Sequence, residues 1–314
     1  MSYNIGSFNL RDFNFSNVSA DMHQEKLSRD FNLIAKIIVQ EKFDVIALQE
    51  INSGLALKHL ICYLNRYKCP WREYTGCFGE EMPNQKGRRD PERYGFIWNS
   101  KRLRLLKTYR NHNPGYYENA GAGNLIRPPY YGRFTARGML GGCNFELRIV
   151  NTHILGPTYK GDRIQEFNIL VKQILPRICD HRELSEDGEF MPAYTFLVGD
   201  YNLSLNKGEQ SVYRIGTITE TRYTGKRRSY KTVQNLATTL KMPKDQNLIE
   251  ECYANDYDHF TYETDLDLKL ILAVQRVEVL NKYFADIEQP VEKLRQYRGK
   301  VSDHVPIKLV VNFK

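Results

Sequence analysis

The sequence contains no run of about 18 apolar residues, so we expect no membrane-spanning helix and no membrane partner. Its first residues lack a basic start and a long apolar core, which argues against a cleaved signal in this chain and favours a cytoplasmic location. No Gly/Ser-rich or Pro-rich linker, repeat or long low-complexity segment divides the 314 residues. We therefore expect one domain over 1–314 with long loops, although the length alone would also accommodate two.

Cysteine is scarce, with six in the chain and no Cys-x-x-Cys pair of the kind that binds zinc. Reduced thiols are the favoured interpretation for a cytosolic protein. A Cys62–Cys69 or a Cys69–Cys77 bridge is the alternative.

Acidic residues are fewer than basic ones, 37 against 45, which gives a formal net charge of +8. An excess of positive charge favours a polyanionic partner such as nucleic acid, because phosphate groups attract it and release counterions on binding. The most basic segment, 221–232, alternates arginine and lysine with tyrosine and has no apolar face. We expect a mobile basic loop there, in which Arg227 and Arg228 contact a phosphate backbone. A plain solvated loop is the alternative.

Several apolar runs of strand-forming residues end in polar side chains. The clearest is Phe196–Asn202, in which an apolar run stops at Gly199 and is followed by Asp200 and Asn202. Alternation along a strand places these two side chains on the same face at its carboxyl end. Buried polar groups are costly unless they are paired or used, so repeated strand ends of this kind predict one shared site. Three others supply Asn9, Gln49 with Glu50, and Asn151 with His153, and Asp303 with His304 stand just before the last apolar run, Ile307–Val311.

The order of these motifs resembles the endonuclease/exonuclease/phosphatase superfamily typified by deoxyribonuclease I. The matching positions are Asn9, Gln49-Glu50, Asn151-Thr152-His153, Gly199-Asp200-Tyr201-Asn202, Tyr257-Asp258-His259 and Ser302-Asp303-His304. Each motif alone is weak, but six in this order extend over nearly the whole chain. The resemblance implies an α/β fold, a four-layered α/β/β/α sandwich, and a metal-dependent phosphodiester hydrolase.

Helical periodicity predicts helices over Asp21–Glu41, Gly54–Tyr67 and Asp162–Cys179. Besides the strands that end in polar residues, we expect Cys69–Phe78 to pair with Tyr94–Trp98, and Thr135–Met139 to pair with Cys143–Thr152. Near the carboxyl terminus the pattern favours strands at Leu248–Tyr253, His259–Tyr262, Leu268–Val277, Asn281–Asp286 and Ile307–Val311.

Carboxylate and amide oxygens suit Mg²⁺, which prefers hard oxygen ligands. Glu50 is the first choice as ligand, with Asn9 and Asp303 completing the set, and Mn²⁺ or Ca²⁺ could serve instead. Histidine exchanges protons near neutral pH, so His153 and His304 are the candidate acid and base. The resemblance implies that Glu92 orients His153, that Asp258 orients His304, and that Asp200 and Asn202 orient water or phosphate or bind a second metal ion. His259 would face the other side of its strand and be structural.

Three further residues are candidate substrate contacts. Arg133 is the first choice for a phosphate-binding arginine, with Arg127 as its substitute, and Asn151 would join it. His153 stands where abasic-site endonucleases of the superfamily commonly have tyrosine, and Tyr257-Asp258-His259-Phe260 departs from the Trp-Cys-Asp-Arg signature of inositol-polyphosphate phosphatases. The favoured function is therefore a Mg²⁺-dependent endonuclease acting on DNA. The alternatives are a phosphodiesterase or phosphatase of lipids or small molecules, and a non-catalytic nucleic-acid-binding module.

Overall fold

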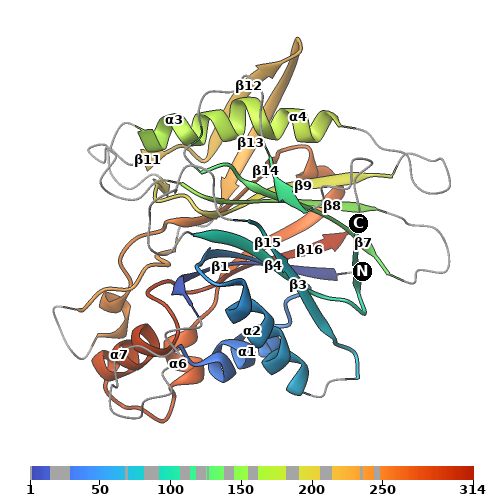
Figure 1. Cartoon of the computed structure of the whole chain (residues 1–314). Coiled ribbons are helices and arrows are strands. Elements are labelled where there is room, and N and C mark those ends of the chain that lie inside the picture. Colours follow the sequence, from blue (N-terminus) through green and yellow to red (C-terminus); the bar gives the residue numbers. More distant parts are fainter. Residues whose placement is uncertain are drawn as a thin grey trace.

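Two β-sheets packed face to face form the centre of the computed structural model, with helices over both outer faces (Figure 1). The structure describes residues 2–14, 29–67, 70–80, 92–106, 114–117, 125, 127–137, 145–154, 162–181, 191–205, 214–233, 236–243 and 248–314. Helices α1 (Phe31–Gln40), α2 (Gly54–Arg66), α6 (Val279–Tyr283) and α7 (Pro290–Lys300) lie on one side. Helices α3 (Asp162–Ile169) and α4 (Leu175–Asp180) lie on the other. The four-layered α/β/β/α prediction is confirmed.

The first sheet has six strands in the order β15-β16-β1-β2-β4-β3. Only β1 and β2 run parallel, and the other neighbours pair antiparallel. The strands are β1 (Ser2–Phe13), β2 (Val45–Ile51), β3 (Tyr74–Phe78), β4 (Arg93–Asn99), β15 (Leu270–Arg276) and β16 (Ile307–Phe313). The first third of the chain and its carboxyl-terminal strands are thus joined in one sheet, in which Asn9 of β1 lies beside Gln49 of β2 in register.

The second sheet has the order β12-β13-β14-β9-β8-β7-β5, with β6 paired to β7. Its β8 and β9 are parallel, and His153 lies opposite Asp200. The strands are β5 (Leu103–Leu105), β6 (Gly115–Tyr116), β7 (Tyr130–Ala136), β8 (Glu146–His153), β9 (Ala193–Asp200), β12 (Ile218–Tyr223), β13 (Lys226–Val233) and β14 (Asp258–Glu263). The short β10 (Ser204–Leu205) and β11 (Arg214–Ile215) pair separately, and α5 (Leu266–Lys269) precedes β15.

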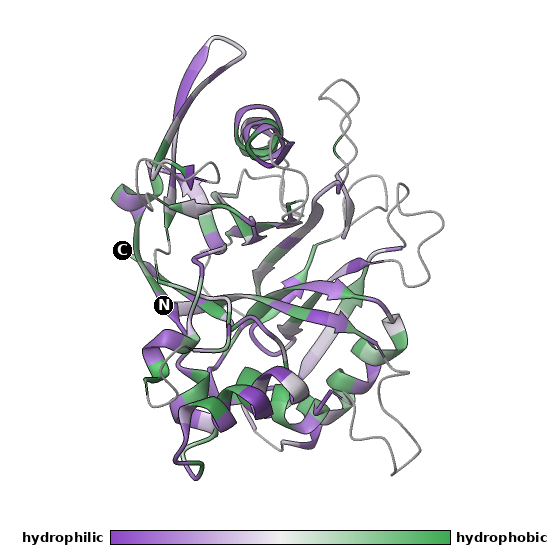
Figure 2. Cartoon of the chain, turned by 90° about the vertical axis from the view of Figure 1, so that its left-hand side faces the viewer, coloured by the Kyte–Doolittle hydropathy of each residue, from purple (hydrophilic) through white to green (hydrophobic). Residues whose placement is uncertain are grey.

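Alternation along the strands separates three apolar clusters. Ile5, Phe96 and Phe196 belong to the cluster between the sheets, which draws on both of them. The intervening strand residues face outward and pack under helices. Phe8 of β1 shares a cluster with Ile34 of α1, and Leu197 of β9 shares another with Phe167 of α3. Figure 2 shows hydrophilic and hydrophobic residues mixed along each helix, as expected for helices that cover a sheet with one face.

Several predicted elements are confirmed and others are wrong. Helix α2 and the continuous helical segment 162–180 agree with expectation, although Leu170–Ile174 is a π-helical turn that periodicity did not indicate. Helix α1 begins later than predicted, because Asp30 accepts a hydrogen bond from the Leu33 backbone N–H and caps it. Asp21, the expected start, lies outside the described residues.

The carboxyl-terminal third departs most from the predicted pattern. The expected strand at Leu248–Tyr253 is a 3₁₀ helix, Ile249–Cys252, and the one at Asn281–Asp286 is replaced by α6. Helix α7 was not predicted. The described cysteines, Cys62, Cys77, Cys179 and Cys252, carry free thiols, so neither bridge alternative is formed.

The basic segment 221–232 is not a mobile loop. It forms most of a β-hairpin, β12 and β13, which extends the second sheet beyond β14 and is largely hydrophilic (Figure 2). The expectation failed because it assumed that the positive charges could not be buried. Arg228 is only 4% exposed and pairs with Asp180 and Glu263, two acids distant in sequence.

Candidate active site

The inward faces of the strands end in polar residues at one end of the sandwich. In β8, Leu147 and Ile149 pack between the sheets, so Asn151 and His153 continue on that face. The same alternation carries Asn9 on β1, Gln49 on β2, Asp200 on β9 and Asp258 at the start of β14. Because β8 and β9 end where the antiparallel β14 begins, these side chains meet.

Irregularities in β1 and β2 direct Glu50 into this cluster. The pairing register shifts between Asn9 and Phe13, and again between Leu48 and Ile51. Glu50 has φ of 56°, in the left-handed region that side chains rarely adopt, which costs about 1–3 kcal/mol. Its Oε1 accepts a hydrogen bond from Asn9 Nδ2 at 2.8 Å, and its Oε2 accepts one from the Asp12 backbone N–H at 3.2 Å.

Asp200 lies at the centre of the cluster. Its Oδ2 accepts a hydrogen bond from Asn9 Nδ2 at 3.1 Å and lies 3.7 Å from His153 Nε2 and 3.6 Å from His304 Nε2. Gly199 before it has φ of 144°, and a Cβ there would lie 1.8 Å from the Thr152 carbonyl oxygen, so only glycine fits. Two imidazoles from opposite sheets therefore face one carboxylate oxygen.

Asn202 links the ends of β8 and β9 by hydrogen bonds. Its backbone N–H donates to Asp200 Oδ1 at 2.8 Å, and its Nδ2 donates to the Ile154 carbonyl at 2.9 Å. The side chain therefore fastens the end of β8 to the turn after β9. This contact holds His153 and Asp200 in place relative to each other.

Asp258 and His304 form the first carboxylate–imidazole pair. His304 Nδ1 lies 2.9 Å from Asp258 Oδ2, which also accepts a hydrogen bond from Thr238 Oγ1 at 2.6 Å. Burial alone would lower the pKa of His304, but the charges of Asp258 and Asp200 outweigh it and raise the pKa to about 10. His304 is therefore an imidazolium at neutral pH in this structure.

Glu92 and His153 form the second pair, as expected, with Glu92 and not its neighbour Arg93 facing the imidazole. Glu92 Oε2 lies 3.4 Å from His153 Nδ1, longer than a normal hydrogen bond, and Oε1 accepts from Arg127 Nη2 at 2.9 Å. The His153 backbone N–H donates to the Tyr94 hydroxyl at 2.8 Å. Arg127, the second choice for a phosphate contact, thus lies behind the histidine and orients its carboxylate partner.

Four predicted substrate contacts lie elsewhere. Arg133 is buried and ion-paired to Glu146, because it sits five register positions from the cluster end of β8. Asn151 is fully buried and spans the two sheets, accepting from Gln49 Nε2 and donating to the Leu48 and Gly95 carbonyls.

The two hairpin arginines are also far from the cluster. Arg228 is buried by its ion pairs, whereas Arg227 is exposed and paired to Glu220. Along β13, Val233 lies near the cluster end of β14, and the seven steps back to Lys226 at about 3.3 Å each place the hairpin tip about 23 Å further away.

Arg11 is a site residue that the sequence analysis missed. Its Nη1 lies 2.9 Å from Asp303 Oδ2, its backbone N–H donates to Asn9 Oδ1, and Arg29 donates to its carbonyl. Arg11 comes two residues after Asn9 on β1, where positive φ values at Arg11 and Asp12 interrupt the regular alternation, so the strand pattern did not indicate it. Its side chain is 41% exposed and carries a positive charge at the rim of the cluster.

The donor set of the cluster suits a divalent cation. Ligand atoms of Asp200, Asp258 and His304 lie within 4.8 Å of one another, which makes them a candidate metal site. The predicted ligands Glu50, Asp303 and the Asn9 side-chain carbonyl offer further hard oxygens of the kind that Mg²⁺ prefers, and their role as ligands stays a prediction. Burial and the Glu50 charge raise the pKa of Asp12, a sign of excess negative charge beside that set. His259 Nε2 donates a hydrogen bond to the Leu203 carbonyl at 2.7 Å on the other face, as expected.

Among the described residues, no helix is both long and apolar enough to span a membrane. No family model and no curated protein matches the sequence. Solved structures do match over nearly the full length of the chain, at low sequence identity.

An endonuclease/exonuclease/phosphatase family protein from Bacteroides thetaiotaomicron is 16% identical, with a TM-score of 0.53, and the match covers 100% of this chain and 98% of that one. The mannosyl-6-phosphatase of Bacteroides thetaiotaomicron VPI-5482 is 16% identical, with a TM-score of 0.53 and coverage of 99% and 100%. ANGEL2, a 2′,3′-cyclic phosphatase, is 13% identical, with a TM-score of 0.54 and coverage of 99% and 95%. The chain therefore has the deoxyribonuclease I-like fold of the endonuclease/exonuclease/phosphatase proteins.

Proposed function

We propose that the chain is a divalent-metal-dependent phosphodiester hydrolase, and that it acts as an endonuclease on DNA. The observation that carries the proposal is the meeting of two imidazole Nε2 atoms at Asp200 Oδ2, each imidazole with a second carboxylate near its Nδ1. Hydrolysis of a phosphodiester needs one group to accept a proton from water and another to give a proton to the leaving oxygen. Two histidines held on opposite sides of one small space meet that need.

In the proposed mechanism the two histidines have different tasks. His304, kept protonated by Asp258, donates its Nε2 proton to the leaving alkoxide. His153 accepts a proton from the attacking water at Nε2, while Glu92 stabilises the charge that develops on the ring. At 3.4 Å the Glu92 contact is long, and catalytic hydrogen bonds of this kind commonly shorten when substrate binds. Asp200 Oδ2, between the two rings, orients the water.

Glu50, Asp303 and the Asn9 carbonyl would hold the cation. A bound Mg²⁺ supplies positive charge against the phosphoryl oxygens and assists the ionisation of water. Arg11 at the rim adds a second positive charge that a phosphate can approach, since its partner Asp303 would turn towards the cation. The roles of Asn9, Glu50 and Asp303 as ligands belong to the proposal.

DNA is the proposed substrate because of the net charge of +8 and the exposed Arg11 at the rim of the cluster. Phosphatases are among the proteins with this fold, so hydrolysis of a small phosphate is the second candidate. The expected result with purified protein is nicking of supercoiled plasmid in Mg²⁺ that stops in chelator and falls by orders of magnitude in His153→Ala. Phosphate release from a lipid or inositol phosphate without nicking would favour the second candidate. DNA binding without any hydrolysis would indicate a non-catalytic module.

A further inference from the structure

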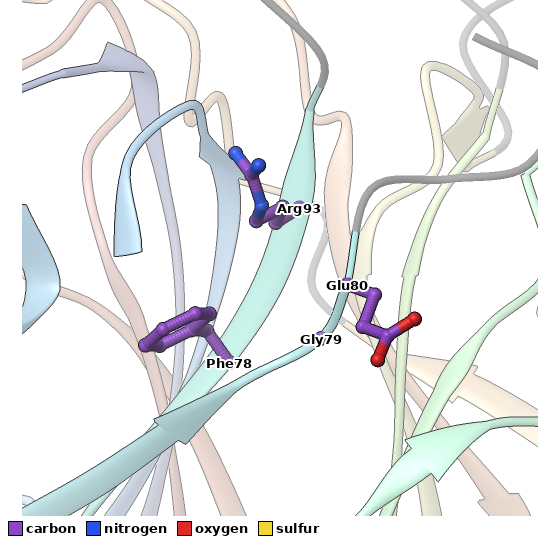
Figure 3. A pocket seen from close by; sticks show the side chains of 4 residues that line it. All are labelled: Phe78, Gly79, Glu80 and Arg93. Carbon is purple, nitrogen blue, oxygen red and sulfur yellow. The ribbon is translucent and has the colours of Figure 1, made fainter. Parts of the chain in front are cut away.

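An open cavity of about 450 Å³ lies near the end of β3, and the described residues that line it are Phe78, Gly79, Glu80 and Arg93 (Figure 3). Its volume lies within the range of about 300–1,000 Å³ that is typical of small-molecule sites. In Figure 3 the Phe78 ring and the Arg93 guanidinium lie on one side of the β3 end, and the Glu80 carboxylate points to the other. None of the roles assigned above uses these residues.

The cavity and the catalytic cluster share the same two segments of chain. Arg93 follows Glu92 directly, so their Cα atoms are about 3.8 Å apart. Arg93 also pairs with Ile51, the neighbour of Glu50, and its Nη1 donates to the Asn52 carbonyl at 2.7 Å. Alternation along β4 directs the Arg93 side chain to the face opposite that of Tyr94, so a group bound at Arg93 would lie across the end of β4 from a phosphate bound at Glu50.

The walls of the cavity are held in place before any ligand binds. The Phe78 ring packs directly on Gly54, where an added Cβ would lie 2.3 Å from ring atoms, and the ring remains 37% exposed. The Gly79 backbone N–H donates to the Tyr94 carbonyl at 2.9 Å, and the Tyr116 hydroxyl donates to the Glu80 carbonyl at 2.6 Å. One side of the aromatic ring is thus packed on α2, and the exposed part faces the cavity.

We propose that this cavity binds the nucleoside next to the scissile phosphate, with its base stacked on Phe78 and its sugar–phosphate beside Arg93. This inference rests on the proposed function and names the substrate class of the same site. A base offers a planar face to an aromatic ring, and a guanidinium is suited to a phosphate oxygen. A lipid tail is a poorer fit, because among the described residues that line the cavity a charged acid and a charged base accompany the single apolar side chain of Phe78.

The first test measures contact with the base directly, without depending on catalysis. Saturation-transfer NMR with thymidine 5′-monophosphate should show strong transfer to the base protons in the unchanged protein. The signal should fall at least fivefold in Phe78→Ala and return in Phe78→Tyr, which keeps a ring. Trp71→Ala is the matched control, since Trp71 is 79% exposed and lies at the opposite end of β3. Equal transfer in Phe78→Ala, or an equal loss in Trp71→Ala, would overturn the proposal.

The second test compares two substrates that share one leaving group. The measured quantity is kcat/KM for thymidine 5′-(p-nitrophenyl phosphate) divided by kcat/KM for methyl p-nitrophenyl phosphate. This ratio should fall about tenfold in Phe78→Ala, which corresponds to the free energy of stacking one base on an aromatic ring. An unchanged ratio contradicts the nucleoside site. If the unchanged protein hydrolyses neither ester with Mg²⁺, the proposed function fails, and the NMR result still decides whether the cavity binds a base.

Discussion

Replacing Asp258 by asparagine tests how His304 is kept in its working state. The carboxylate Oδ2 lies 2.9 Å from His304 Nδ1 and also accepts from Thr238 Oγ1. Asparagine has nearly the same shape but no charge, so it cannot stabilise an imidazolium. The pKa of His304, about 10 in this structure, should fall, because only the charges of Asp200 and Asp303 would remain to oppose the effect of burial.

The expected loss of catalytic rate in Asp258→Asn follows from the role of the Asp258–His304 pair in proton transfer. Positioned acid–base groups contribute about 10²- to 10⁴-fold to rate, equivalent to about 3–5 kcal/mol in the transition state. We expect Asp258→Asn to lose catalysis in that range. Thr238→Val is the matched control: it removes one hydrogen bond to the same oxygen but keeps the charge, so its loss should be about tenfold or less.

The assay is kcat/KM for a phosphodiester in Mg²⁺, with circular dichroism to confirm folding and with His304→Ala made alone and in combination. Asp258 acts through His304, so the double variant should lose no more than His304→Ala alone. Losses that multiply in the double variant would refute the reasoning, as would a loss in Thr238→Val equal to that in Asp258→Asn.

Three further predictions concern groups outside the catalytic pairs. Burial opposes ionisation of Glu41, but hydrogen bonds from two lysines lower its pKa, so it stabilises the fold above pH 4.5 and loses this effect as pH falls. In urea denaturation, the unfolding free energy of the unchanged protein should therefore exceed that of Glu41→Gln by about 1–2 kcal/mol at pH 7. This difference in unfolding free energy should vanish by about pH 3. A constant difference would contradict the assignment. Asn151→Leu should cost about 2–4 kcal/mol in the same assay, since it leaves its buried partners on the first sheet unpaired; a neutral result would show that the bridge is dispensable. Arg228→Gln should lower Tm and exposed Arg227→Gln should not; equal shifts would contradict the difference in burial.

The strand ends were predictable because a period of two is set by the chain itself. Once Leu147 and Ile149 face the other sheet, Asn151 and His153 must follow, and the same rule places Asp200 and Asp258. This argument gives the direction of a side chain but not its depth. Asn151 was therefore predicted as a substrate contact, although it lies buried beneath the cluster.

Other features depend on contacts between distant parts of the chain. The residues that neighbour Arg133 and Arg228 in the sequence do not show that these arginines are buried. Their partners Glu146, Asp180 and Glu263 come close only in the folded chain. The left-handed backbone at Glu50 has no local signature either, since glutamate seldom adopts it. That the chain forms a single domain stays a prediction.

The central claim is that residues from distant segments create one cation site for phosphodiester hydrolysis. Anomalous diffraction from crystals soaked in Mn²⁺ tests it most directly. We predict a single strong peak in contact with the Glu50 carboxylate and close to Asp200, which Glu50→Gln abolishes while the fold is retained. An absent peak at millimolar Mn²⁺, or a peak bound away from Glu50 and Asp200, would contradict the account.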